Sequence, residues 1–92
     1  MYARLALTKY LIGTTNMEEK ETPLRRIREE LGVSQEIVAR RTSLTTGTYR
    51  RAENGQPVKY STAQEILQAI NSILRERNKP EVSLKDIGLT LM

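Results

Sequence analysis

SQEIVARRTSLTTGTYRRAENG, residues 34–55, is the stretch that decides the fold of this chain. Ser34 and Thr45 can each cap a helix, because a hydroxyl oxygen accepts hydrogen bonds from backbone N–H groups left free in a first turn. The pattern predicts one helix from Ser34 to about Arg41 and a second over residues 46–53, ended by Asn54-Gly55. The centre of the expected structure is therefore a pair of short helices joined by a tight turn, and the second helix is basic.

The residues before and within this stretch predict a further helix and an inward face. Thr22 followed by Pro23 is typical of a helix start, and Gly32 is typical of a helix end. Between them, apolar residues recur at helical spacing, namely Leu24, Ile27 and Leu31. Within residues 34–55 the side chains expected to face inward are Ile37, Val38, Leu44, Tyr49 and Ala52.

A long helix is predicted after Pro57. Ser61 and Gln64 form a capping-box pattern at its start. Apolar residues then repeat at intervals of three and four up to about Arg77, namely Ala63, Ile66, Leu67, Ile70, Ile73 and Leu74. Ser83 is expected to cap a short last helix. We therefore expect an all-α, five-helix domain over residues 22–92, preceded by an N-terminal extension over residues 1–21.

The composition excludes several functional classes. The 92 residues include no cysteine and no histidine, which removes disulfides, cysteine-ligated metals, the usual general base and the commonest metal ligand. We expect no enzymatic activity, no cofactor and no metal site. Arg4 and Lys9 interrupt the fairly apolar residues 2–12, a segment too short to cross a membrane. A soluble, cytoplasmic protein is the expectation, and residues 2–12 fit a strand and a helix equally well.

The net charge of +4 is concentrated in one part of the chain. Residues 23–59 carry eight basic and four acidic side chains, whereas basic and acidic side chains balance in residues 1–22 and in residues 60–92. A basic surface of this kind is typical of proteins that face phosphates. A solvated helix surface is the plainer interpretation of a charge run, but here the excess coincides with the helix pair.

The outer face of the predicted helix 46–53 fits the major groove of DNA. Thr46 and Gly47 are short and stand at its start, and Arg50, Arg51 and Asn54 follow on the same surface. An arginine can donate two parallel hydrogen bonds to one guanine. Glycine costs a helix about 0.8–1 kcal/mol relative to alanine, so Gly47 indicates close approach of the backbone to a ligand. A tolerated surface glycine is the alternative.

Other residues are candidates for contacts with DNA phosphates. Gln35 lies in the first turn of its helix, where free N–H groups and the helix dipole attract an anion. Lys59 is a plainer candidate. For Arg40 and Arg41, a phosphate contact and a solvated helix face are equally good interpretations.

From Ser34 to Gly55 the chain resembles the Cro/phage-repressor (XRE) helix-turn-helix family. The resemblance rests on the Ser-Gln-Glu opening, on Ala39 where two helices cross closely, and on the Glu53-Asn54-Gly55 ending. It covers roughly residues 22–75 and implies a five-helix repressor-type domain, usually a homodimer on pseudo-palindromic DNA. The DNA-contacting positions it implies, together with neighbouring candidates, are Gln35, Thr45, Thr46, Gly47, Thr48, Arg50, Arg51, Asn54 and Lys59.

The same resemblance implies an ion pair between Arg28 and Glu53 that joins the first helix to the third, which would make Arg28 structural. Three residues depart from the family pattern. Ser43 stands where the family prefers a glycine in the turn, Thr42 where it prefers leucine, and Tyr49 where it prefers valine or isoleucine. We therefore expect a slightly altered turn.

The expected function is that of a sequence-specific DNA-binding transcriptional regulator, most simply a repressor, which places helix 46–53 in the major groove as a dimer. Its expected partners are double-stranded DNA and a second copy, and residues 1–16 or the C-terminal tail are the candidates to bind a further protein partner. The C-terminal candidates for the dimer contact are Leu84, Ile87, Leu89 and Leu91. Ordinary closure of the core is an equally good interpretation of these apolar residues.

Two other functions stay open at the level of sequence. An antitoxin of a toxin–antitoxin pair would bind a protein partner as well as DNA. A co-activator or RNA-associated module that binds nucleic acid without sequence preference would use the same basic face, but excess random DNA would displace it from any given site.

Overall fold

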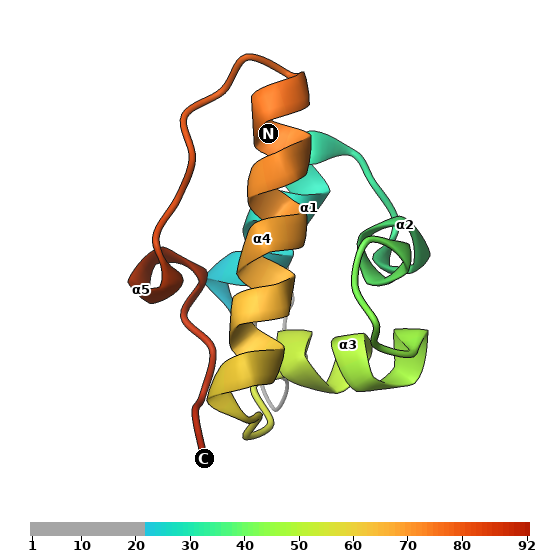
Figure 1. The fold of residues 1–92 in the computed structure, drawn as a ribbon, viewed down its shortest axis with the longest axis vertical. Coiled ribbons are helices and arrows are strands. Elements are labelled where there is room, and N and C mark those ends of the chain that lie inside the picture. Colours follow the sequence, from blue (N-terminus) through green and yellow to red (C-terminus); the bar gives the residue numbers. More distant parts are fainter. Residues whose placement is uncertain (1–21) are drawn as a thin grey trace, which may run out of the picture.

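The computed structural model describes residues 22–92 and contains five helices in that range (Figure 1), namely α1 (Pro23–Leu31), α2 (Gln35–Arg40), α3 (Thr46–Glu53), α4 (Tyr60–Glu76) and α5 (Leu84–Ile87). The predicted all-α, five-helix architecture is confirmed. Extended pairing within the described range is confined to a parallel bridge between Val58 and Leu91. The extension predicted for residues 1–21, with its partner contact, lies outside the described residues.

Four of the helices begin at a hydroxyl side chain, as the sequence predicts. The caps are Thr22 for α1, Ser34 for α2, Thr45 for α3 and Ser83 for α5. In each case the side-chain oxygen accepts a hydrogen bond from the backbone N–H three residues further on. Such a cap stabilises a helix by about 1 kcal/mol, because it satisfies a donor that the helix itself leaves unpaired.

The start of α4 differs from the prediction. Lys59 is the residue that precedes the helix, without a side-chain cap, and Ser61 lies within the first turn. Gln64 donates its amide to the hydroxyl of Tyr60 instead of completing a capping box with Ser61. The physical reason lies in the preceding residues, because the bridge at Val58 keeps the chain extended up to Lys59 and the helix starts directly after it.

Helix α4 is the central element, with α5 on one side and α2 and α3 on the other (Figure 1). Its inward stripe is fully or almost fully buried: Ala63, Ile66, Ala69, Ile70, Ile73 and Leu74. Burying a side chain of leucine or isoleucine size stabilises a fold by about 1.5–3 kcal/mol. Leu24, Tyr49 and Ala52 complete this core from α1 and α3, as expected. No helix within residues 22–92 is both long and apolar enough to cross a membrane.

The prediction that Ile37 faces the core is wrong. Helix α2 has only six residues, and it turns Val38 and Ala39 toward α4, which leaves the side chain of Ile37 at the edge with 43% exposure. The inward face of α2 is therefore narrow and depends on two adjacent small apolar residues.

Helix α5 and the residues that follow it mostly close the core of this chain. Ile87 is fully buried, so its assignment to a contact with a second copy is wrong, because its side chain is already covered by this copy. Leu84 and Leu89 are partly buried against the same core, whereas Leu91 is 44% exposed. Gly88 ends α5 in the left-handed conformation, and a Cβ there would lie 2.6 Å from Cδ of Pro23 in α1.

Candidate nucleic-acid interface

Glu53, the last residue of α3, carries a buried carboxylate that joins α1, α2 and α3. Its side chain is inaccessible to solvent. Arg28 of α1 donates to both carboxylate oxygens through Nε and Nη2. Gln35 Nε2 donates to Oε1 at 3.0 Å, and the Tyr49 hydroxyl donates to Oε2 at 2.6 Å. The charge has lost its water but both oxygens are hydrogen-bonded, which is the condition under which a buried ion is tolerated.

Opposing effects act on the pKa of the Glu53 carboxyl. Burial alone would raise this pKa, because it disfavours the charged form, but the hydrogen bonds from Arg28, Tyr49 and Gln35 outweigh burial and hold the pKa below its ordinary value. Conversely, burial and the adjacent carboxylate raise the pKa of the Tyr49 phenol far above its ordinary value. At neutral pH the carboxylate is therefore charged and the phenol is a neutral donor.

The pair of Arg28 and Glu53, expected from the family resemblance, is thus present as an ion pair. Arg28 also donates from Nη1 to the carbonyl oxygen of Val33 at 2.8 Å, which fixes the connection between α1 and α2. The departure at Tyr49 has a structural role as well, because a valine or isoleucine there could not donate to Glu53. Thr22 adds a further link, since its hydroxyl donates to the carbonyl oxygen of Glu53 at 2.9 Å.

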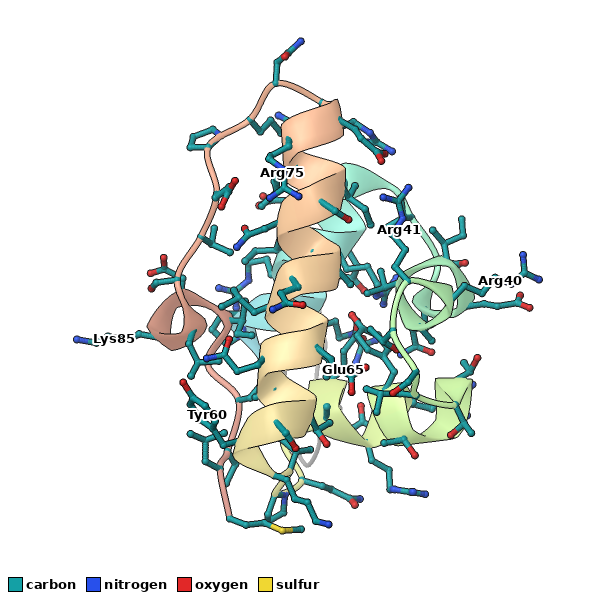
Figure 2. The ribbon with its side chains drawn as sticks, in the orientation of Figure 1. Arg40, Arg41, Tyr60, Glu65, Arg75 and Lys85 are labelled. Atoms are coloured by element: carbon teal, nitrogen blue, oxygen red, sulfur yellow. The ribbon has the colours of Figure 1, made fainter. Side chains whose placement is uncertain are left out.

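The turn between α2 and α3 is held by side chains of α4 (Figure 2). Arg41 donates to both oxygens of the Glu76 carboxylate at 2.8 and 3.0 Å. The backbone N–H of Ser43 donates to Glu65 at 2.8 Å, and its hydroxyl contacts the same carboxylate. These bonds hold the pKa values of the Glu65 and Glu76 carboxyls below their ordinary values.

These contacts explain two departures from the family pattern. A glycine could provide the N–H for Glu65 but not the hydroxyl of Ser43, and a leucine could not replace the hydroxyl of Thr42. That hydroxyl donates to the carbonyl oxygen of Ala39 at 2.7 Å and accepts from the N–H of Leu44 at 3.0 Å. Within residues 22–92 the turn contains no residue with positive φ. The turn therefore replaces the conformational freedom of glycine with side-chain hydrogen bonds.

The outer surface of α3 carries the residues proposed to contact DNA. Thr46, Gly47 and Thr48 in its first turn are partly exposed, and Arg50, Arg51 and Asn54 are exposed. A Cβ at Gly47 would meet nothing closer than the Thr45 hydroxyl at 3.9 Å, so packing within the chain does not require glycine there. The surface combines short side chains at the tip of the helix with long donors behind them.

Gln35 connects this outer surface to the buried carboxylate. A carboxylate only accepts and a guanidinium only donates, so the amide must present Nε2 to Glu53 and Oε1 to Arg50. The corresponding distances are 3.0 Å for the first contact and 3.3 Å from Arg50 Nε for the second. Gln35 is thus a bridge between α2 and α3 rather than an isolated side chain at a helix start.

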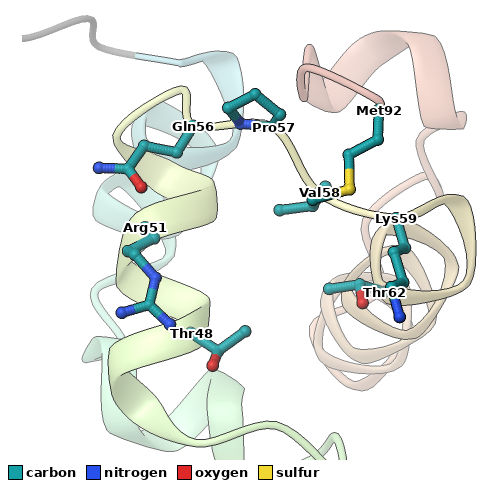
Figure 3. A pocket seen from close by; sticks show the side chains of 8 residues that line it. All are labelled: Thr48, Arg51, Gln56, Pro57, Val58, Lys59, Thr62 and Met92. Carbon is teal, nitrogen blue, oxygen red and sulfur yellow. The ribbon is translucent and has the colours of Figure 1, made fainter.

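Lys59 lies across a cleft from α3 (Figure 3). The cleft has a volume of about 290 Å³ and is lined by residues of α3, of the α3–α4 connection, of the first turn of α4 and of the C-terminal end: Thr48, Arg51, Gln56, Pro57, Val58, Lys59, Thr62 and Met92. Two of these eight side chains are cationic and none is anionic. Such a lining attracts phosphates.

The structure distinguishes Arg40, the last residue of α2, from Arg41, the residue that follows the helix, which sequence reasoning had left open together. Arg41 points toward α4, where it is paired with Glu76, whereas Arg40 points away from α4 and forms an exposed ion pair with Glu36 (Figure 2). The pairing of Glu36 with Arg40 and that of Tyr49 with Glu53 follow the spacing of four residues on one helix and could have been read from the sequence. No local signal predicts the contacts of Glu65 and Glu76, which join residues 22 and 35 positions apart.

Comparison with known families agrees with this geometry. A family model described as helix-turn-helix matches residues 24–77, which is more than half of the 92 residues. The chain belongs to the Cro/C1-type (XRE) helix-turn-helix family. No curated protein and no solved structure matches the chain.

Membership in this helix-turn-helix family makes the chain a DNA-binding regulator. The match extends from α1 to the end of α4, so the Glu53 contacts and the outer surface of α3 lie within the family region. Helix α5 and the residues that pair with Val58 lie beyond it. The matched region therefore covers α1 to α4 and does not include this last segment.

Proposed function

We propose that this protein is a sequence-specific transcriptional repressor that binds double-stranded DNA as a homodimer and places α3 in the major groove. The observation that carries the proposal is the division of α3 into two faces. Its inner face is fixed by buried Tyr49, Ala52 and Glu53, while its outer face presents Thr46, Gly47 and the exposed arginines. A recognition helix requires both a fixed position and outward donors.

The outer residues divide by the contacts they can make. Arg50, tied to Gln35 and exposed, is the candidate to read a guanine, and Thr46 can contact a base edge or a thymine methyl group. Arg51, Asn54 and Lys59 lie further along the surface and are candidates for phosphate contacts, which supply affinity rather than sequence preference. Repression would follow from occupation of the site, which needs no catalytic group.

The homodimer is supported by apolar side chains that this copy leaves open. Leu91 is 44% exposed and Tyr60 is 58% exposed. Leu84 and Leu89 remain candidates for the edge of such a contact, since they are only partly buried. Sedimentation velocity over a dilution series tests this, and a monomer at micromolar concentration would contradict the dimer.

Selection of binding sites from random DNA tests sequence specificity directly. We expect one enriched sequence with two related half-sites, whose spacing reports the distance between the two copies of α3. Recovery of unrelated sequences, or displacement by excess random DNA, would show that the protein binds DNA without sequence preference.

The Arg50→Ala variant tests the assignment of base reading. We expect a loss of about 1–3 kcal/mol in binding free energy to the selected site and a relaxed preference at one base pair. Lys85→Ala is the matched control, because it removes the same charge from α5, on the opposite side of α4 from α2 and α3 (Figure 2). An equal loss on all DNA sequences would mean that Arg50 contacts only phosphates.

A further inference from the structure

The last residues of the chain are hydrogen-bonded to the connection between α3 and α4. The backbone N–H of Val58 donates to the carbonyl oxygen of Thr90 at 2.9 Å, and the N–H of Met92 donates to the carbonyl oxygen of Val58 at 2.9 Å. Both polar backbone groups of Val58 are thereby used, and its side chain is almost buried. In Figure 1 the C-terminus accordingly lies beside the first turn of α4.

This bridge lies next to the cationic residues of the cleft. Lys59 directly follows Val58, keeps an extended backbone and is itself the residue before α4. Its side chain and that of Arg51 face the same cleft, which Met92 closes on one side (Figure 3). Among residues 22–92, neither cation is paired with a carboxylate. The local arrangement leaves two cations available to an outside anion.

We propose that residues 90–92 form a brace that positions Lys59 for a phosphate of the DNA backbone. The proposal rests on the proposed function, because it concerns how the same surface binds DNA. Without the brace, residues 56–59 are a connection between two helices whose order must be created when DNA binds. With the brace, both the N–H and the carbonyl of Val58 are hydrogen-bonded, so the backbone of Lys59 has a defined position before DNA binds. Less conformational entropy is therefore lost on binding.

The brace acts through Lys59, so its effect should follow the properties of a phosphate contact. The Met92→Pro variant removes the N–H that donates to Val58, next to the bridge of Leu91 with Val58. We expect DNA binding to weaken about three- to tenfold on every sequence tested. The dependence of affinity on salt should also become shallower by about one phosphate contact, while the preferred sequence stays the same.

Two double-mutant cycles separate positioning from a general structural effect. In the Lys59→Ala background Met92→Pro should cause little further loss, because the residue that the brace positions is gone. In the Arg50→Ala background the two losses should add, because Arg50 reads bases from a different part of α3. Additive losses with Lys59→Ala would overturn the proposal. Met92→Ala separates the side chain from the backbone, and a loss equal to that of Met92→Pro would overturn the brace as well.

Hydrogen exchange on the unmodified chain provides a test that does not depend on a variant folding. The amide protons of Val58 and Met92 should exchange slowly in the free protein and more slowly still with the selected DNA bound. Exchange at these two amides that DNA leaves unchanged would contradict the proposal. If the unmodified chain binds no DNA at all, the proposed function fails together with the brace, whereas binding with additive losses overturns the brace alone.

Discussion

Removal of the Tyr49 hydroxyl is the sharpest test of how this domain is held together. Tyr49 is fully buried, and its O–H donates to Glu53 Oε2 at 2.6 Å. Tyr49→Phe keeps the aromatic ring in the core and deletes only the donor. The carboxylate would then depend on Arg28 and Gln35 alone, with one oxygen losing a short hydrogen bond that no water can reach.

The expected cost follows from the kind of hydrogen bond that is lost. A hydrogen bond to a charged group contributes about 1.5–3 kcal/mol to stability. Because Glu53 keeps two other donors, we expect a value near the lower half of that range, about 2 kcal/mol. For a domain of this size that corresponds to a fall in melting temperature of about 8–16 °C.

Thermal unfolding followed by circular dichroism measures this change. Tyr60→Phe is the matched control, since Tyr60 is 58% exposed and loss of its hydroxyl should change stability by less than about 0.5 kcal/mol. A melting temperature of Tyr49→Phe within about 2 °C of the unmodified protein would refute the argument. It would mean that Tyr49 contributes only its ring.

Two further predictions concern Glu53 and the glycines that end α1 and α5. The pKa of Glu53 is lowered on folding, so its contribution to stability is complete above the ordinary glutamate pKa of about 4.3 and is lost as the pH falls through the lower folded value. In urea unfolding from neutral to acidic pH, the free energy of unfolding should therefore fall more steeply for the unmodified protein than for Glu53→Gln. Equal falls for the two proteins would contradict this. Gly32→Ala should cost about 1–2 kcal/mol, because Gly32 has a φ of 72° but open space around it. Gly88→Ala should cost about 1–3 kcal/mol more than Gly32→Ala, because its Cβ would also lie 2.6 Å from Cδ of Pro23. Equal melting temperatures for the two variants would contradict this and show that α5 can move away from α1.

Local rules predicted four of the five helix starts and the apolar stripe of the central helix, whereas contacts between distant residues had to be observed. Ser34 and Thr45 cap their helices because a hydroxyl three residues before a free N–H is a local arrangement, and sequence shows it directly. Ser61 satisfied the same local rule but lost to a tertiary contact, since the pairing of Val58 with the C-terminal end fixes where α4 begins. Ile87 shows a different limit of sequence reasoning. An apolar side chain suits a dimer contact and the core equally well, and only the observed packing distinguishes the two.

The candidate site shows the same division. The outer face of α3 follows from helical periodicity, so the positions of Arg50 and Arg51 were predictable. The contacts that hold α3 in position were less predictable. The family pattern indicates that Arg28 meets Glu53, but it contains no tyrosine at position 49 and therefore no hydroxyl donor to that carboxylate. The hydrogen bond from the Ser43 N–H to Glu65 joins two residues that are 22 positions apart in the sequence, so no local pattern predicts it.

Helix α3 is held at both ends by carboxylates, and this explains how an exposed reading surface can have a fixed position. At its C-terminal end Glu53 binds α1 and α2 from inside the core. Before its N-terminal end, Glu65 of α4 binds the backbone of Ser43 in the turn. An exposed arginine usually samples many rotamers, but Arg50 contacts an amide whose orientation the buried carboxylate sets. The position of the Arg50 donor is therefore linked to a charge in the interior, and we expect a change at Glu53 to act on the outer surface of α3 as well as on stability.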